Sequence, residues 1–559
     1  MSARAMVRAA ARRRRRAAAG VAAATLISAG AAASSAGAIE VNSLADPGNN
    51  NCNDGTCTLR EAIDLADSTP LTPDTITFKS GLSGTINLNA AVGQLEVYWP
   101  VSIQGPGPEV VTISGDSDGN GSPDTRVLYL NADAVTMSGL TIAKGAGKPD
   151  IAAPNFHGGA IYAFSSTVSM HDMVVTGSVI PAHSGGGIWS GDSDMTITSS
   201  KIVGNDAAAR GGGISAEEVL GNHSASLAIR DSLIAGNDAD YGGGVYASAI
   251  DSVKVERSTI SGNVAGTYGA GGLTSNAPAT IESSTISGND AAAGGGGGWG
   301  FGTNSTGSRL VNSTVAGNEA GYGGGLLTTS ESSGQIVAAG SIVADNGEEE
   351  LFAVGDSPKF TLVRSLVEGP EADAFAQFPG TTNILGVDPQ LGALADNGGP
   401  TQTMAPAATS PAIDAGRANG LTIDQRLLPR TVEQPGPNPP GSDGTDMGAV
   451  ERTDQTRPTI ETRTEGKAKA GKPITITVSS NEAARVNAAA SAKVKKKKVK
   501  FKGARGNVAA GGSLTLELKL SKRRARILRE AGKAKALVYV AAEDAAFNTT
   551  EETFKVKLK

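Results

Sequence analysis

The chain has 559 residues, of which 74 are glycine and only 4% are aromatic. Glycine has about twice its usual share but follows no strict triplet period, which excludes a collagen-like chain. The apolar content of 39% allows a core, and we expect that core to consist of small and aliphatic side chains in thin stacked layers.

Charge divides the chain into three parts. The first 38 residues carry seven arginines and no acidic residue, residues 39–454 carry 17 basic and 46 acidic residues, and residues 455–559 carry 25 basic and 9 acidic residues. The net charges are therefore +7, −29 and +16. This predicts two separately built surfaces of opposite sign in the central and C-terminal parts.

The N-terminus has the order of parts of an export signal. The basic run Arg12–Arg16 precedes an alanine-rich apolar stretch, and Ala36-Gly37-Ala38 fits a small-residue cleavage site. We therefore expect residues 1–38 to be a signal peptide and the protein to be secreted, either extracellular or at the cell surface. A membrane anchor is the alternative, but leucine and isoleucine are scarce in this stretch. We recognise no later segment that is apolar enough to span a bilayer.

The sequence has two cysteines, Cys52 and Cys57. In an exported protein, so close a pair is expected to form a disulfide bond. Two cysteines are too few for a structural zinc site, so we predict no metal there.

The central part repeats a short apolar run that ends, in most units, in Gly-Asn. The repeated asparagines are Asn205, Asn237, Asn263, Asn289, Asn318 and Asn346. The steps between them are 32, 26, 26, 29 and 28 residues, and glycine clusters such as Gly211–Gly213 recur between them. Repetition with a unit of this length indicates a solenoid.

The composition of the unit indicates which solenoid it forms. Runs such as Met195–Thr198 and Leu227–Arg230 alternate in polarity, which predicts strands, and the glycines and Gly-Asn pairs mark turns. We predict an all-β fold in which residues 101–395 form a parallel β-helix with three strands and three turns per coil. The six asparagines are expected to form a structural hydrogen-bond ladder along one turn.

These units resemble those of right-handed parallel β-helix repeat proteins, which share the pectin lyase-like fold. Gly158–Ile161 matches the Gly-Gly-Ala-Ile half of the repeat of polymorphic outer membrane proteins, whereas the Phe-x-x-Asn half is absent. The similarity covers roughly residues 100–350. It implies a right-handed parallel β-helix and leaves the chemistry open.

A second motif precedes the repeats. Cys57–Ile63 resembles the CSLREA motif, with threonine in place of serine, and that family places the motif at the start of secreted β-helices. Leu59, Ile63 and Leu65-Ala66 would form one face of a short helix. We expect residues 39–100 to be an N-terminal cap with the first strands, in which this helix covers the open end of the first coil.

Several motifs follow the last repeat in a fixed order. They are Asn397–Thr401, Ser410–Gly416, Asp424–Arg426, Pro429-Arg430 and Asp446–Glu451. This order resembles the choice-of-anchor Q domain, which closes bacterial surface β-helices ahead of varied anchoring segments. We therefore expect residues 396–453 to be a closing segment; a sorting signal or hydrophobic tail of the kind common in that family is not recognised.

Residues 454–559 alternate in the manner of strands with one solvated face, as in Ile474–Val478 and Leu514–Leu520. Asp544–Asn548 resembles a turn of bacterial immunoglobulin-like modules, although Phe547 replaces its glycine. We predict a small, basic, immunoglobulin-like β-sandwich.

Two basic clusters lie in this last domain. The first contains Lys493, Lys495, Lys496, Lys497, Lys498, Lys500 and Lys502, and the second contains Lys522, Arg523, Arg524, Arg526 and Arg529. We expect them to attract anionic polymers of the cell envelope or acidic glycans. Nucleic acid is a weaker candidate, because export removes the chain from the genome and few aromatic residues are present for stacking. The alternative is a solvated charged surface without a partner.

Two functions fit this sequence. Parallel β-helices include pectate lyases and polygalacturonases, which need clustered acids to hold calcium or to act as acid and base. The paired-aspartate and His-Gly motifs of polygalacturonases are not visible, and we assign no catalytic residue. We therefore expect an extracellular binding or adhesive platform that needs no cofactor. A polysaccharide lyase or hydrolase, with calcium if it is a lyase, is the alternative.

Two residue pairs leave a catalytic interpretation open. Arg60 and Glu61 belong to the cap or form a catalytic pair, and we favour the cap. His157 and His183 are 26 residues apart, one repeat step, so they are expected on neighbouring coils. They form a metal or catalytic pair or are two surface imidazoles, and we favour the latter.

Overall fold

The computed structural model describes residues 38–47, 52, 55–68, 73–147, 157–221, 224–292, 295–328, 336–354, 359–369, 375–377, 382–432, 438–452, 457–464, 468–495, 497–544 and 548–559. Apart from Ala38, the predicted signal peptide lies outside these residues. Among the described residues, no helix combines the length and the apolar character that crossing a membrane requires.

One coil of the solenoid contains four short strands rather than the predicted three. An example comprises β16 (Ile214–Glu217), β17 (Ser226–Arg230), β18 (Leu233–Ala235) and β19 (Asp238–Tyr241). Each strand pairs in parallel with its equivalent one coil later. The additional strand is β19, which lies between the Gly-Asn turn and the glycine cluster and was too polar to be recognised as a strand.

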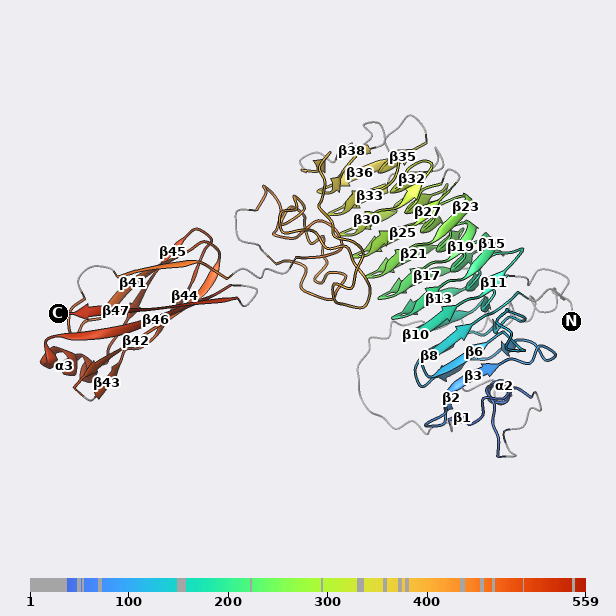
Figure 1. The fold of residues 1–559 in the computed structure, drawn as a ribbon, viewed down its shortest axis with the longest axis horizontal. Helices are drawn as coiled ribbons and strands as arrows, with labels where there is room; N and C mark the ends of the chain where they lie inside the picture. Colours follow the sequence, from blue (N-terminus) through green and yellow to red (C-terminus); the bar gives the residue numbers. More distant parts are fainter. Residues whose placement is uncertain are drawn as a thin grey trace, which may run out of the picture. The chain divides into compact units, whose positions relative to one another are not determined.

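Stacked coils generate a parallel β-helix, which confirms the expected fold class (Figure 1). The strands that follow the glycine clusters form a ten-stranded parallel sheet. It contains, in order, β4 (Leu95–Val97), β7 (Leu128–Leu130), β9 (Ile161–Phe164), β12 (Ile188–Gly191), β16, β20 (Val245–Ser248), β24 (Leu273–Asn276), β28 (Trp299–Phe301), β32 (Leu326–Thr328) and β35 (Leu351–Ala353).

Two longer rows complete most coils, and the long strands β8 (Val135–Ala143) and β10 (Thr167–Thr176) belong to both of them. The first row contains β1 (Ile39–Val41), β2 (Asp74–Phe78), β5 (Val101–Gln104), β8, β10, β13 (Asp194–Thr198), β17, β21 (Ser252–Glu256), β25 (Ala279–Glu282), β29 (Arg309–Val311), β33 (Ile336–Ala339), β36 (Phe360–Val363) and β38 (Phe375–Gln377). The second contains β3 (Gly84–Asn87), β6 (Val111–Ser114), β8, β10, β14 (Lys201–Val203), β18, β22 (Thr259–Ser261), β26 (Thr285–Ser287), β30 (Thr314–Ala316), β34 (Ile342–Ala344), β37 (Leu366–Val367) and β39 (Ile384–Leu385). A six-stranded sheet is formed by β11 (Val179–Ile180), β15 (Asp206–Arg210), β19, β23 (Val264–Tyr268), β27 (Asp290–Ala291) and β31 (Glu319–Ala320).

Helix α2 (Leu59–Asp67) covers the first coil, as expected for a cap. Thr58 caps its N-terminus in a capping box with Glu61, and Leu59 and Ile63 join the solenoid core. Leu65 is 42% exposed, so its predicted place on the buried face was wrong. The helix turns Ala62 inward instead.

Parallel pairing begins with β1 and β2, so the solenoid starts at Ile39, ahead of the predicted start of its coils at residue 101. The charged residues of the cap have structural partners. The guanidinium of Arg60 pairs with Asp46 at 2.7 Å and donates to the carbonyls of Gly93 and Gln94. Arg60 thus ties the cap to the first coil, and Glu61 accepts the backbone N–H of Thr58 in the capping box of the helix.

The six repeated asparagines form one continuous ladder. Nδ2 of each asparagine donates to Oδ1 of the next, over distances of 2.8–3.0 Å, from Asn205 to Asn346. The same Oδ1 atoms also accept the backbone N–H of the preceding asparagine. At the last coil, Asn346 donates to both carboxylate oxygens of Glu350, which ends the ladder.

A second ladder was not predicted. Serines five residues before each asparagine accept the backbone N–H of the equivalent serine one coil earlier. Its members include Ser200, Ser232, Ser258, Ser284, Ser313, Ser341 and Ser365. The residue before most of these serines has a positive φ, as Asp231 does at 49°, and marks the corner between two rows of strands. The two ladders satisfy buried backbone groups at successive corners.

The closing segment lies along the side of the solenoid. It covers the outer face of the second row, where Thr259, Thr285 and Thr314 are at most 1% exposed. Gln425 binds both Thr259, at 2.9 Å, and Thr285, at 2.6 Å, and the backbone N–H of Ala449 donates to Thr314. The segment therefore covers coils that are already complete, and its described residues add no strand to the stack.

The C-terminal domain has two antiparallel sheets. One consists of β40 (Ile460–Thr464), β41 (Ile474–Ser480) and β45 (Ser513–Leu518), and the other of β42 (Ala484–Val494), β43 (Lys497–Lys500), β44 (Ala504–Val508), β46 (Ala534–Glu543) and β47 (Thr549–Leu558). Buried residues of both sheets, such as Ile476 and Val538, belong to one core. This arrangement is consistent with the predicted sandwich.

Candidate functional site

The ten-stranded sheet presents one outward row of side chains along the solenoid. In each strand the second residue points away from the core because side chains alternate between the two faces. In register, this row reads Glu96, Tyr129, Tyr162, Trp189, Ser215, Tyr246, Thr274, Gly300, Leu327 and Phe352. Five of the 22 aromatic residues of the sequence lie in this one row.

In the first half of this row, the aromatic side chains stack on one another and so cover their own surfaces. The rings of Tyr129 and Tyr162 are stacked at 5.3 Å, and those of Tyr162 and Trp189 at 4.6 Å. The guanidinium of Arg126 lies 5.0 Å from the Tyr162 ring, and His157 stacks on Trp189. Tyr162 and Trp189 are consequently buried and offer little surface to a ligand.

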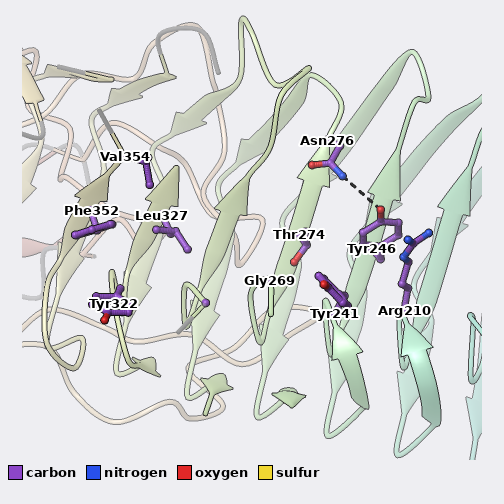
Figure 2. A pocket seen from close by; sticks show the side chains of 11 residues that line it. Arg210, Tyr241, Tyr246, Gly269, Thr274, Asn276, Tyr322, Leu327, Phe352 and Val354 are labelled. Carbon is purple, nitrogen blue, oxygen red and sulfur yellow. Dashed lines mark hydrogen bonds between the residues drawn. The ribbon is translucent and has the colours of Figure 1, made fainter. Parts of the chain in front are cut away.

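The second half of the row is open and forms a groove of about 600 Å³. Its lining is Arg210, Tyr241, Tyr246, Gly269, Thr274, Asn276, Gly295, Tyr322, Leu327, Phe352 and Val354. Figure 2 shows Tyr246 and Thr274 on one pair of neighbouring strands and Leu327 and Phe352 on another, with the strand of Gly300 between the two pairs and with Tyr241 and Tyr322 beside them. Since the strands are about 4.8 Å apart, the five coils from β20 to β35 give the groove a length of about 19 Å.

Glycines keep this groove open. Gly300 occupies the outward row itself, and a Cβ on it would lie 3.3 Å from the Cβ of Ala270. Gly269 has a φ of +83°, and a Cβ on Gly295 would collide with the carbonyl oxygen of Gly269. The backbone of adjacent coils therefore approaches closely here, and no side chain fills the middle of the groove.

Most polar groups of the groove lie at the end with Arg210, and Tyr322 adds a hydroxyl at the other end. The guanidinium of Arg210 lies 5.1 Å from the Tyr246 ring and pairs with Glu217 at 3.6 Å. Asn276 lies 3.4 Å from the Tyr246 hydroxyl. Tyr241 and Tyr322, 37% and 55% exposed, provide rings and hydroxyls in contact with solvent. The groove thus combines apolar ring surface with hydrogen-bonding groups.

No residue in the described lining of this groove carries a carboxylate. Glycoside hydrolysis uses a pair of carboxyl groups, and calcium in a lyase needs several oxygen ligands. The chemistry offered by the groove is therefore contact, hydrogen bonding and one positive charge.

A smaller recess of about 290 Å³ adjoins the groove and shares Arg210 and Tyr241 with it. The structure places His157 and His183 here on neighbouring coils, as their spacing predicted, with ring centroids 5.3 Å apart. Burial, with the nearby charges of His183 and Arg126, lowers the pKa of His157 to about 4, so that ring is neutral at pH 7. Neither histidine belongs to a group of described residues whose geometry could hold a metal.

The other predicted residues lie elsewhere. Cys52 and Cys57 form the expected disulfide bond near the cap, and both are therefore unavailable as metal ligands. Five of the six ladder asparagines are buried, Asn346 is half-buried, and none of the six lines the groove.

The described residues of the two basic clusters are exposed. Lys493 and Lys498 lie opposite each other in the hairpin of β42 and β43. Helix α3 (Lys522–Ala531), which carries Arg523, Arg524 and Arg526, contacts both of these strands. The two clusters therefore lie on elements that contact each other, and we refer to them together as the basic surface. Lys495 and Lys497 belong to the first cluster, whereas Lys496 lies outside the described residues.

No family model matches this chain, and comparisons with curated proteins and with solved structures also find no match.

The groove was not predicted from the sequence, although a signal for it was present. The outward residue is the second one after each glycine cluster, as in Gly-Gly-Gly-Val-Tyr at Gly242–Tyr246 and Gly-Gly-Gly-Leu-Leu at Gly323–Leu327. Reading that position down the aligned repeats predicts the aromatic row directly. Tyr241 and Tyr322 lie just before the clusters and could be found in the same way.

Proposed function

We propose that this chain is an exported binding protein whose groove between Arg210 and Val354 holds a linear glycan along the solenoid axis. The main supporting observation is the open row of apolar and aromatic side chains at the inter-coil spacing, lined without carboxylates. Sugar rings present flat apolar faces ringed by hydroxyls. Tyrosine rings, Asn276 and Arg210 match both features.

The direction of the groove supports a polymer rather than a small molecule. Equivalent positions repeat every coil, so a polymer with a short repeat can make similar contacts with successive strands. The single guanidinium, which lies over Tyr246, favours a chain that carries some negative charge, such as a uronate. The disulfide bond is compatible with an oxidising, extracellular location.

The resemblance to CSLREA and choice-of-anchor Q proteins supports the same proposal, since those segments belong to secreted and surface β-helices. In this proposal, the solenoid is a rigid platform that presents the groove. The basic surface of the C-terminal domain holds the protein at an anionic envelope polymer.

A glycan screen tests the proposal against the enzymatic alternative. The full-length exported protein is incubated with pectin, alginate, cellulose and chitin, and both bound protein and new reducing or unsaturated ends are measured. We expect retention on at least one polymer without new ends. Sustained release of such ends would show a lyase or hydrolase instead, and no retention on any polymer would remove the glycan proposal.

A further inference from the structure

A second potential ligand site lies in a loop between β6 and β7, within the first coils of the solenoid. The loop leaves the coil after Gly115 and returns at Asp124, where the backbone N–H groups of Asp124 and Thr125 donate to the carbonyl of Gly115. It contains Asp116, Asp118 and Asp124, and each offers a carboxylate oxygen. These three oxygens lie within 4.8 Å of one another.

Asp116 occupies the corner that the asparagine ladder occupies in later coils. The register pairs Ser114 with Ala143, Ala143 with Thr176 and Thr176 with Val203. Two residues further on, these strands reach Asp116, Gly145, Ser178 and Asn205. Asp116 is only 2% exposed because this corner is packed between coils.

Unlike the ladder asparagines, Asp116 has a carboxylate oxygen without a donor. In the ladder, Oδ1 accepts the backbone N–H one coil earlier, which here belongs to Asn89 because Asn87 pairs with Ser114. That N–H donates to Asp46 instead, at 2.9 Å. Oδ1 of Asp116 is buried and has no hydrogen-bond partner among the described residues. A buried carboxylate oxygen without a donor needs another positive partner.

The ion pair made by the other oxygen of Asp116 does not neutralise the three carboxylates of the loop. Oδ2 of Asp116 pairs with Lys144 at 2.9 Å, so three carboxylates face one ammonium. Asp124 accepts two hydrogen bonds from Ser117, at 2.9 Å from the backbone N–H and at 2.7 Å from the hydroxyl, and these are neutral donors.

We propose that this loop binds one calcium ion through Asp116, Asp118 and Asp124. The spacing from Asp116 to Gly121 is D-x-D-x-N-G, the start of the calcium loop of EF-hands, and Asp124 stands at the ninth position. Gly121 has a φ of +99°, and its N–H donates to Asp116 at 2.9 Å, which closes the turn around the carboxylates.

The loop departs from that pattern at its twelfth position. Val127 stands where an EF-hand has a bidentate glutamate, and it is buried in the core. With fewer charged ligands, we expect weak binding, with a Kd of about 10⁻⁴–10⁻³ M, the range of extracellular calcium modules. This inference does not depend on the proposed glycan groove.

Calorimetric titration of the full-length exported protein with calcium chloride tests the site. The variant Asp118→Asn/Asp124→Asn removes two carboxylates from exposed positions and keeps their shapes. Glu109→Gln removes an exposed carboxylate outside the loop as a matched control. Other acidic residues of the protein also attract calcium weakly. The test is therefore the difference in calcium affinity between the variants. We expect the asparagine variant to lose affinity at least about ten-fold at one site and the control to retain it.

Calcium should also raise the melting temperature of the wild-type protein and of Glu109→Gln. The increase should be much smaller for the asparagine variant. Without calcium, all three proteins should melt alike, which shows that the variants fold. If the double variant is less stable without calcium, Asp118→Asn alone replaces it in both measurements. Equal calcium affinity in wild-type and loop variant, or no calcium binding by the wild-type protein, would overturn the proposal.

Discussion

Each ladder asparagine uses its whole side chain. Nδ2 of Asn263 donates to the carbonyl of Ile234, at 3.1 Å, and to Oδ1 of Asn289, while Oδ1 of Asn263 accepts two hydrogen bonds from Asn237. The residue is fully buried. Removing the amide therefore leaves several buried groups in two adjacent coils without partners.

Replacing Asn263 with leucine should destabilise the solenoid by at least about 2 kcal/mol, since each buried group left unsatisfied costs about 1–3 kcal/mol. Urea unfolding followed by tryptophan fluorescence measures the change in midpoint. Asn304→Leu, at an exposed position, is the control and should shift the midpoint little. A shift as small as that of the control would mean that the ladder contributes nothing to stability.

At the scale of an element, the ladder ends at Glu350. Both oxygens of Glu350 accept hydrogen bonds from Asn346, yet burial raises the pKa of its carboxyl from 4.5 to about 7. Between these values the folded state holds a proton that the unfolded chain has released. Stability should therefore fall as the pH rises from about 4.5 to 7 and be flat above 7 as far as this group is concerned.

The variant Glu350→Gln cannot titrate and should lack this part of the pH dependence. Melting temperatures of both proteins at pH 4.5, 5.5, 6.5 and 7.5 should show the wild-type protein falling relative to the variant. Glu319→Gln, at an exposed position, should keep the wild-type slope. Parallel curves for wild-type and Glu350→Gln would show that the carboxyl titrates as it does in the unfolded chain.

The sequence predicted elements that depend on local chemistry and repetition. The Gly-Asn steps predicted the parallel coils. Each buried asparagine packs closely against a glycine of the nearby cluster, so the two features recur together in every coil. A Cβ on Gly213 would lie 3.0 Å from Nδ2 of Asn237. The cap helix was predictable from its apolar spacing, except for Leu65.

What escaped prediction depends on distant contacts. Thr259 looks like an ordinary outward strand residue, and only the later closing segment buries it. The serine ladder was present at a constant five-residue offset but was hidden by the commonness of serine in turns. The groove required the alignment of outward positions over five coils, and its walls come from Tyr241 and Tyr322, which lie before the glycine clusters.

At the scale of the whole molecule, charge is segregated between the solenoid and the C-terminal domain. Residues 455–559 carry a net charge of +16, and the two clusters of the basic surface lie on elements that contact each other. Exposed charges are screened within about 10 Å at 0.1 M salt. Binding of this surface to an anionic polymer should therefore weaken steeply with salt.

The salt dependence can be measured with the full-length protein on surfaces coated with lipopolysaccharide or alginate. Lys497→Glu/Lys498→Glu/Arg523→Glu/Arg524→Glu should abolish binding at low salt. A control that makes the same change in net charge is Lys555→Glu/Lys557→Glu/Lys533→Glu/Lys535→Glu, at exposed or half-buried positions outside the two clusters. Retention that is indifferent to salt, or that is lost equally in both variants, would exclude a specific basic surface.

The central claim is that the groove binds a glycan through its tyrosines. The most direct measurement is the affinity for the polymer retained best in the screen, compared between the wild-type protein, Tyr241→Ala/Tyr322→Ala and the control Tyr98→Ala. Tyr98 is also exposed, at 45%, but lies outside the groove. We predict at least about a ten-fold loss of affinity for the double variant and no loss for Tyr98→Ala. The reason is that truncating a tyrosine that becomes buried in a binding interface costs more than about 1 kcal/mol. Equal affinity of the double variant and the wild-type protein would contradict the account.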